Sequence, residues 1–94
     1  MIVIRRIVGN SMLPTLRPGS IVVGWRASAW SKLKVGDVVI IEHGGLEKIK
    51  RISQIKDQQI FLLGDNPSES KDSRDFGWLS EDAVRAILIW PRYT

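Results

Sequence analysis

The sequence predicts an all-β fold, mostly β with at most one short helix, arranged as a sheet or a partly open barrel. Short runs rich in Val and Ile alternate with Gly, Pro and Asp along the chain, which is typical of several short strands joined by tight turns. No long stretch shows the 3.6-residue apolar period of a helix. Because 94 residues leave room for one hydrophobic core, we expect a single domain over residues 1–94.

Six strands are expected, over residues 2–8, 21–25, 38–42, 46–55, 60–63 and 86–90. The third is a continuous apolar run, which favours burial on both of its faces. Gly44 and Gly45 predict a two-residue hairpin between the third and fourth strands. The polar stretches 26–34 and 64–77 are expected to be loops, and Ser80 is expected to cap one short helical turn.

Lys50 occupies a strand position where an apolar residue would be expected. Side chains alternate along a strand, so Lys50 shares a face with Ile52 and is drawn inward if Ile52 is buried. Burial removes hydration from an ammonium group and lowers its pKa, and a neutral lysine can take a proton from a serine hydroxyl. The alternative is that Lys50 and Arg51 are solvated charges that protect an edge strand from aggregation.

Ser11 lies in a constrained bend that follows the first strand. Pro14 fixes its own φ and restricts the residue before it, so the chain turns here and presents the Ser11 hydroxyl. Most serines in such bends only cap or turn the backbone. The alternative, functional hypothesis is that Ser11 is a nucleophile, and a nucleophilic serine requires a base elsewhere in the chain.

The composition excludes several kinds of site. There is no cysteine and only one histidine, His43, so disulfides, thiolate metal sites and multi-histidine zinc sites are ruled out. The net charge is +4, but the basic residues are scattered, which disfavours nucleic acid as a partner. No apolar run approaches the length of a membrane span. We expect a soluble, cytoplasmic domain, unless a membrane anchor has been removed.

The sequence also suggests where the aromatic residues lie. His43 precedes the Gly-Gly turn and is expected to be an exposed turn residue without a catalytic role. Trp25, Trp78 and Trp90 are expected to pack in the core. Trp30 stands in a polar loop and is a candidate for contact with a membrane or with the substrate.

The polar loop 64–77 combines Asx, Ser and charged residues that fold through local side-chain to backbone hydrogen bonds. It superficially suggests a calcium loop, but Ser70 stands where that pattern needs glycine, so we expect no metal there. Asp72 and Arg74 are close enough to pair and stiffen the loop.

Four motifs together resemble the type I signal peptidases. They are Ser11-Met12-Leu13-Pro14-Thr15, Gly36-Asp37-Val38-Val39, Ile49-Lys50-Arg51 and Gly64-Asp65-Asn66 with Ser70-Lys71-Asp72-Ser73-Arg74. Their order and spacing agree with that family from about residue 9 to residue 90. Within it, the short length and the 64–77 loop look most like the nickel-type superoxide dismutase maturation proteases.

The resemblance implies a serine–lysine dyad endopeptidase on a signal-peptidase-like, partly open barrel. Ser11 matches the nucleophile and Lys50 the general base; Lys48 is a rival only if the strand register slips. Ser70 matches the serine that hydrogen-bonds the lysine. Asp72 and Arg74 match the pair that holds this part of the site together.

The oxyanion of the intermediate would be met by the Ser11 backbone N–H. Some family members add a serine hydroxyl two residues before the nucleophile, where this chain has Gly9. The Asn10 side chain is the substitute donor that we consider. No cofactor is implied, and nickel would belong to the substrate enzyme.

The substrate would be a precursor protein, or its leader peptide, bound as an extended strand beside a sheet edge. The resemblance favours removal of an N-terminal leader from the nickel-type superoxide dismutase precursor. Alternatives are signal peptidase cleavage of secretory preproteins, self-cleavage as in SOS-repressor catalytic domains, and a noncatalytic β module. We disfavour the SOS-repressor type because no DNA-binding helices precede Ile2 and because the 64–74 loop fits the peptidases better.

Overall fold

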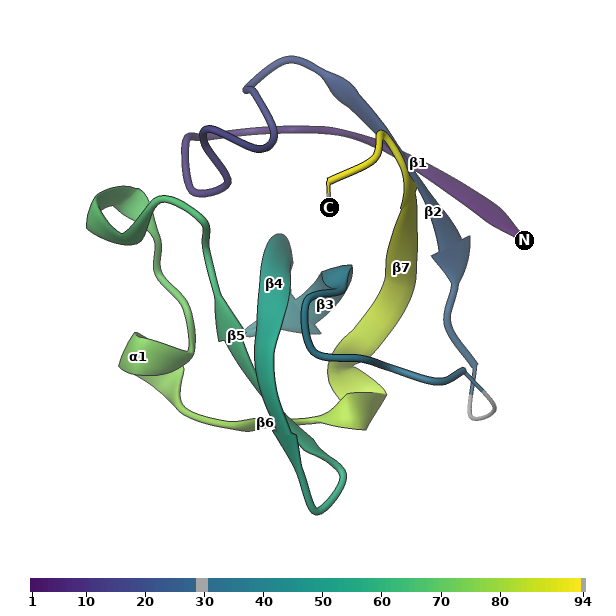
Figure 1. Ribbon diagram of the computed structural model, residues 1–94, viewed down its shortest axis with the longest axis vertical. Helices are drawn as coiled ribbons and strands as arrows, with labels where there is room; N and C mark the ends of the chain where they lie inside the picture. Colours follow the sequence, from purple (N-terminus) through teal and green to yellow (C-terminus); the bar gives the residue numbers. More distant parts are fainter. Residues whose placement is uncertain (29–30, 94) are drawn as a thin grey trace.

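The structure, a computed structural model, describes residues 1–28 and 31–93. Within these residues one antiparallel sheet of seven strands, in the order β1-β2-β7-β3-β4-β5-β6, curls into a partly open barrel (Figure 1). The strands are β1 (Ile2–Arg6), β2 (Ile21–Arg26), β3 (Val38–His43), β4 (Leu46–Lys56), β5 (Gln59–Leu63), β6 (Leu79–Ser80) and β7 (Val84–Trp90). The helical turns are η1 (Pro67–Glu69), α1 (Ser73–Phe76) and η2 (Glu81–Ala83). The all-β prediction is confirmed.

Three details of the predicted order are wrong. The first strand ends at Arg6 rather than at residue 8, and β6, a strand of two residues, was not expected. The 64–77 region is not a plain loop, because it contains η1 and α1. The expected helical turn after Ser80 is present as η2, and the Ser80 hydroxyl accepts a hydrogen bond from the Asp82 N–H.

The core consists of two apolar clusters on the two faces of β3. Val38 and Ile40 belong to the first cluster, and Val39 and Ile41 belong to the second. All four are buried, as the continuous apolar run predicted. β3 lies between β7 and β4 in the sheet, so it joins the two halves of the barrel.

The β3–β4 hairpin turns at Gly44 and Gly45, both with positive φ, as a two-residue hairpin of this type requires. The prediction that His43 is an exposed turn residue is wrong. His43 is the last residue of β3, half-buried, and its ring stacks on Phe76 of the α1 turn with centroids 4.4 Å apart. The unexpected helical turn provides this partner.

The described tryptophans lie at the surface, which overturns the expectation of a core position. Trp25 is 53% exposed and Trp90 57% exposed, and Trp78 is also exposed. On β2 and β7 the inward positions are taken by smaller residues such as Val22 and Ala86, so the indoles face outward. Trp30 lies outside the described residues. No helix in the described part of the chain is long and apolar enough to cross a membrane.

Candidate active site

Ser11 is held by a compact turn that follows β1. Gly9 has a φ of 79°, which allows the chain to leave the strand sharply. The Leu13 N–H donates to the Asn10 carbonyl and the Leu16 N–H to the Met12 carbonyl. Met12 and Leu16 are buried in the first core cluster. Two apolar anchors therefore fix the turn, and the half-buried Ser11 lies between core and solvent.

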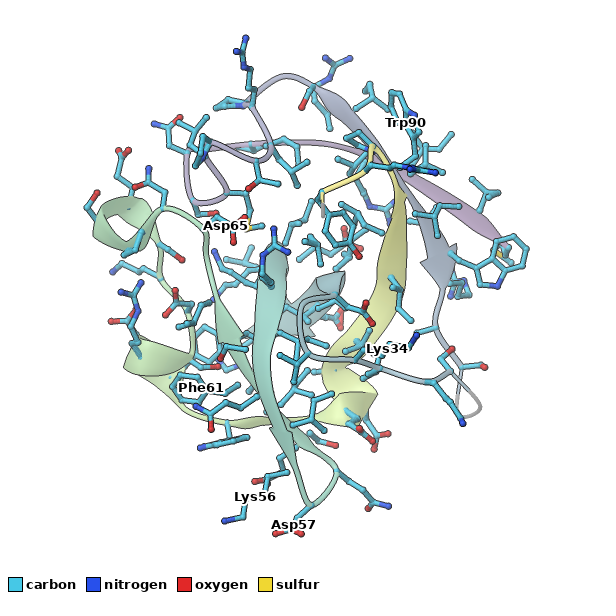
Figure 2. All side chains as sticks on the ribbon, in the orientation of Figure 1. Lys34, Lys56, Asp57, Phe61, Asp65 and Trp90 are labelled. Atoms are coloured by element: carbon cyan, nitrogen blue, oxygen red, sulfur yellow. The ribbon has the colours of Figure 1, made fainter. Side chains whose placement is uncertain are left out.

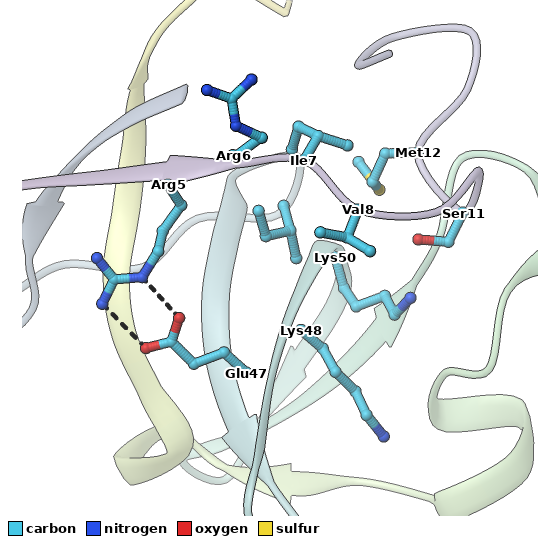
Figure 3. A pocket seen from close by; sticks show the side chains of 10 residues that line it. Arg5, Arg6, Ile7, Val8, Ser11, Met12, Glu47, Lys48 and Lys50 are labelled. Carbon is cyan, nitrogen blue, oxygen red and sulfur yellow. Dashed lines mark hydrogen bonds and ion pairs between the residues drawn. The ribbon is translucent and has the colours of Figure 1, made fainter. Parts of the chain in front are cut away.

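Lys50 points into the same space from β4. It pairs with Val39 in the β3–β4 register, and only 5% of it is exposed, because it shares a face with the buried Ile52. Ser11 and Lys50 both line a cavity of about 340 Å³. In Figure 3 the Lys50 amine and the Ser11 hydroxyl point toward one another across it. The structure thus brings together the two residues of the predicted dyad.

The surroundings of Lys50 make its neutral form more accessible than that of a solvated lysine. Burial lowers the pKa of its amine, the nearby Asp72 carboxylate opposes this effect, and the positive charges of Lys48 and Arg74 add to the lowering. Within the described residues the Lys50 side-chain amine makes no hydrogen bond or ion pair. A desolvated lysine beside a hydroxyl is the arrangement that a general base requires.

Lys48 lines the same cavity but occupies a different environment. Its amine lies 4.8 Å from the centre of the Phe76 ring, and the residue is only half-buried. Lys48 pairs with Ile41, whereas Lys50 pairs with Val39, and the β3–β4 register has no shift between these two pairs. Lys50 is therefore the buried lysine of the two.

Asp72 is the centre of a hydrogen-bond network beside Lys50. Its fully buried carboxylate accepts hydrogen bonds from the Gly64 N–H (2.9 Å), the Ser70 hydroxyl (2.8 Å) and the Arg74 guanidinium (2.9 Å). It also caps α1 through the Arg74 N–H. Burial opposes ionisation of Asp72, but these hydrogen bonds outweigh it and hold its pKa below the ordinary range of an aspartate.

The Ser70 hydroxyl is bonded differently from what the resemblance implied. It donates its hydrogen bond to Asp72, not to Lys50. The Asp72 carboxylate is a charged acceptor, and hydrogen bonds to charged acceptors are stronger than those between neutral groups. Ser70 therefore links the loop to the ion pair of Asp72 and Arg74.

The loop after β5 packs directly on the Ser11 turn. The Asn66 N–H donates to the Ser11 carbonyl (2.8 Å), and the Asn66 side chain donates to the Asn10 carbonyl (3.0 Å). A Cβ at Gly64 would lie 2.1 Å from the Ser70 hydroxyl and 2.7 Å from the Ser11 carbonyl oxygen. Only glycine allows this approach between the turn with Ser11 and the loop with Ser70.

Sequence reasoning assigned no role to a second ion pair that connects all four motifs. The Arg51 guanidinium binds Asp65 in a bidentate manner (2.9 and 2.8 Å) and also donates to the Gly36 carbonyl. Thr15 donates its hydroxyl hydrogen to the same Asp65 carboxylate. The hydrogen bonds to Arg51 and Thr15 lower the pKa of Asp65 despite its burial. One signal was present, since each of these residues lies inside one of the four motifs described above.

The residues expected to bind the oxyanion lie in the Ser11 turn. The Ser11 N–H makes no hydrogen bond to the described part of the chain, so it is free to meet an incoming oxyanion. Asn10 is exposed, and its carbonyl holds the Asn66 side chain. Gly9 offers no side-chain donor.

The comparison with protein families gives one match. The family model described as peptidase S24-like matches residues 2–78, which includes β1 to β5, Ser11, Lys50 and the Asp72–Arg74 pair. A search of curated proteins found no significant match. Since the match spans most of the sequence and the fold is all-β as expected, the chain belongs to the peptidase S24-like family of serine peptidases.

Proposed function

We propose that this chain is a serine–lysine dyad endopeptidase in which Ser11 is the nucleophile and Lys50 the general base. One observation carries the proposal: a buried lysine without a partner in the described structure and with a lowered pKa shares a cavity with the serine of a rigid turn. The family assignment supports peptidase activity in general.

The chemistry follows from these two groups. Neutral Lys50 takes the Ser11 hydroxyl proton as Oγ attacks the scissile carbonyl, and the Ser11 N–H stabilises the oxyanion. We assign the second oxyanion donor to the Asn10 side chain, which is exposed beside Ser11. The Lys50 ammonium then protonates the leaving amine, and the peptide bond breaks to leave an acyl-enzyme. Water, deprotonated by Lys50, attacks the ester and releases Ser11 and the acid product.

The cavity suits a substrate bound as an extended strand. Within residues 1–28 and 31–93, β1 pairs only with β2, and residues 46–50 of β4 pair only with β3. In an antiparallel ladder alternate residues direct their backbone groups away from the partner strand, so both strands direct backbone groups toward the cavity between them. The Ile4 carbonyl among these accepts a hydrogen bond from the Arg5 guanidinium. A peptide there can add to a sheet edge, with alternate side chains in the cavity.

For the substrate we propose the N-terminal leader of a precursor protein, with the nickel-type superoxide dismutase precursor as first candidate. This choice rests on the motif resemblance. Secretory preproteins are the second candidate. Self-cleavage, as in SOS-repressor catalytic domains, is a third candidate. A noncatalytic β module would instead lack any cleavage and would show salt-dependent binding to DNA or RNA if its partner is a nucleic acid.

The test is incubation with the superoxide dismutase precursor, a secretory preprotein and a mixed peptide library, with new termini and the intact enzyme mass read by mass spectrometry. We expect cleavage that is lost in Ser11→Ala and in Lys50→Ala, both of which keep the fold by circular dichroism. Lys48→Ala is the matched control and should retain cleavage at alkaline pH. Cleavage that survives in either dyad variant contradicts the dyad. Cleavage of the preprotein alone, or of the chain itself, keeps the dyad and changes the substrate.

A further inference from the structure

The outer face of β1, β2 and β7 is apolar. Residues paired across antiparallel strands project on the same face, and the pairings run Ile2–Trp25–Ile87 and Ile4–Val23–Trp90. Trp25, Trp90, Ile2 and Ile4 are each about half exposed, and Ile89 beside them is exposed too. The outer apolar face consists of these five exposed residues and the half-buried Val23: Ile2, Ile4, Val23, Trp25, Ile89 and Trp90. Ile87, although paired with Trp25, is half-buried and packs against the second core cluster.

This face is unusual because the opposite face of the same three strands is apolar as well. Val22, Ala86 and Leu88 pack into the first core cluster. An antiparallel sheet that covers a core on one side normally alternates with polar residues on the side that meets water. Isolated exposed apolar residues are ordinary, whereas a contiguous apolar patch marks an interaction surface.

The charges of the chain show which partner fits. Residues 1–36 and 83–94, which include β1, β2 and β7, hold eight Lys or Arg and no Asp or Glu. Residues 37–82 hold six Lys or Arg and ten Asp or Glu. β1, β2 and β7 lie together, apart from α1 and β5 (Figure 1). In Figure 2 Trp90 lies at the opposite end of the molecule from Lys56 and Asp57. The outer apolar face therefore belongs to a strongly basic half.

We propose that the outer apolar face docks on an anionic phospholipid membrane. Tryptophans suit the boundary between acyl chains and headgroups, because one part of the ring system is apolar and the indole N–H is polar. Each basic residue near an anionic membrane surface adds to the attraction, and the exposed Arg26 and Arg92 follow Trp25 and Trp90 closely in the chain. A second copy is disfavoured as occupant, because two basic halves would repel each other. The membrane proposal does not depend on peptidase activity.

Docking in this way would bring the cavity to the membrane. β1 supplies Ile2 and Ile4 to the outer apolar face, and its end supplies Arg5 and Arg6 to the cavity that contains Ser11. A bidentate ion pair between Arg5 and Glu47 connects β1 to β4 at this cavity (Figure 3). The strand that contacts lipid is thus also a wall of the candidate active site.

The experiment is flotation of the full chain with vesicles of phosphatidylglycerol and phosphatidylcholine, and with vesicles of phosphatidylcholine alone, together with tryptophan fluorescence. We expect binding to the anionic vesicles, a blue shift of the emission, and weakening as salt is added. Trp25→Ser combined with Trp90→Ser should weaken binding by at least about tenfold, the effect of a 1.4 kcal/mol loss. Trp78→Ser, on the β6 side of the molecule, is the matched control and should bind normally.

The charge requirement is tested separately. Arg26→Gln combined with Arg92→Gln should weaken binding to anionic vesicles, whereas Lys56→Gln combined with Lys71→Gln, in residues 37–82, should not. The proposal is overturned if the folded wild type does not bind anionic vesicles, or if it binds both vesicle types equally. It is also overturned if ultracentrifugation shows self-association that the double tryptophan variant abolishes, because the face would then be a contact between two copies.

Discussion

At the scale of single residues, Lys50 is the most informative position in the chain. Its neighbours on the inward face of β4 and β3 are aliphatic, so an apolar side chain would pack there without the desolvation cost of an ammonium group. Instead the amine lies in a cavity beside Ser11. The cost of burying it appears as a lowered pKa, which makes the lysine neutral at lower pH than a solvated one. A destabilising residue with this property is explained by chemistry rather than by folding.

The pH dependence of cleavage should follow Lys50. Because only the neutral amine accepts the Ser11 proton, kcat/KM should rise with pH through the Lys50 pKa. The charge of Lys48 helps to lower that pKa, so Lys48→Met should raise it and move the rise in kcat/KM to higher pH. The measurement is a pH–rate profile, with Lys56→Met at the far end of β4 as control. An unshifted profile, or a shift toward acid, would contradict the assignment of Lys50.

Gly64 should be intolerant of any side chain. A Cβ there would overlap the Ser70 hydroxyl and the Ser11 carbonyl, so Gly64→Ala should push the two loops apart. We expect a loss of about 1–3 kcal/mol in the free energy of unfolding and, since an ångström of misplacement is costly in catalysis, roughly a 10²-fold loss of kcat. Denaturation and steady-state kinetics measure the two effects.

The control for Gly64 is Ile60→Val, in the second core cluster. It should cost about 0.5–1.5 kcal/mol of stability while kcat stays near that of the wild type. If Gly64→Ala is fully active, the contact between the loops does not position Ser11.

The position of Lys50 could be predicted from sequence because strand parity alone decides its face. Its shared face with Ile52 required only that β4 be a strand. The partner of Ser70 could not be predicted in this way. Which acceptor its hydroxyl meets depends on how the 64–74 loop folds around Asp72, and that loop has no periodicity to read.

At the scale of elements, the ion pair of Arg51 and Asp65 holds the site together. It joins β4, the loop after β5 and the Gly36 turn, and Thr15 adds the Ser11 turn. A guanidinium provides several donors in a fixed plane, so one side chain can satisfy a carboxylate and a carbonyl at once. Four separate segments, including those that contain Ser11 and Lys50, are thereby fixed relative to one another.

Arg51→Lys should disturb the site although it keeps the charge, because an ammonium cannot reproduce the bidentate contact. We expect a loss of about 1–3 kcal/mol in stability and roughly a tenfold lower kcat/KM. The matched control is Arg85→Lys, since Arg85 pairs with Glu42 at the exposed surface and such pairs contribute little. Thermal unfolding and kinetics of both variants are the measurements. Equal effects in the two variants would show that Arg51 has no special role.

The elements that sequence reasoning identified correctly are those with strong local signals. β3 is a continuous apolar run, and Gly44-Gly45 specifies the hairpin that follows it. The α1 turn has only four residues, and its support is tertiary: a capping box from Asp72 and a hydrogen bond from the Leu62 N–H to the Ser73 hydroxyl. β6 is formed by two residues that pair with β5. Neither element has enough residues for a period to appear.

At the scale of the whole molecule, stability depends on the two core clusters that β3 separates. A domain of 94 residues buries a smaller share of its surface than a larger one and has little stability to spare. The same molecule leaves the outer apolar face uncovered. Apolar residues in the two locations should therefore respond very differently to truncation.

Ile40→Ala and Ile89→Ala provide this comparison with the same chemical change. Ile40 is 1% exposed in the first core cluster, whereas Ile89 is 52% exposed on the outer apolar face. Ile40→Ala should cost about 2–5 kcal/mol, because it leaves a cavity in a packed core. Ile89→Ala should change the free energy of unfolding by no more than about 0.5 kcal/mol. Urea denaturation in the absence of lipid measures both. Comparable losses would mean that the outer face is already covered in solution, since only a buried isoleucine is so costly to truncate.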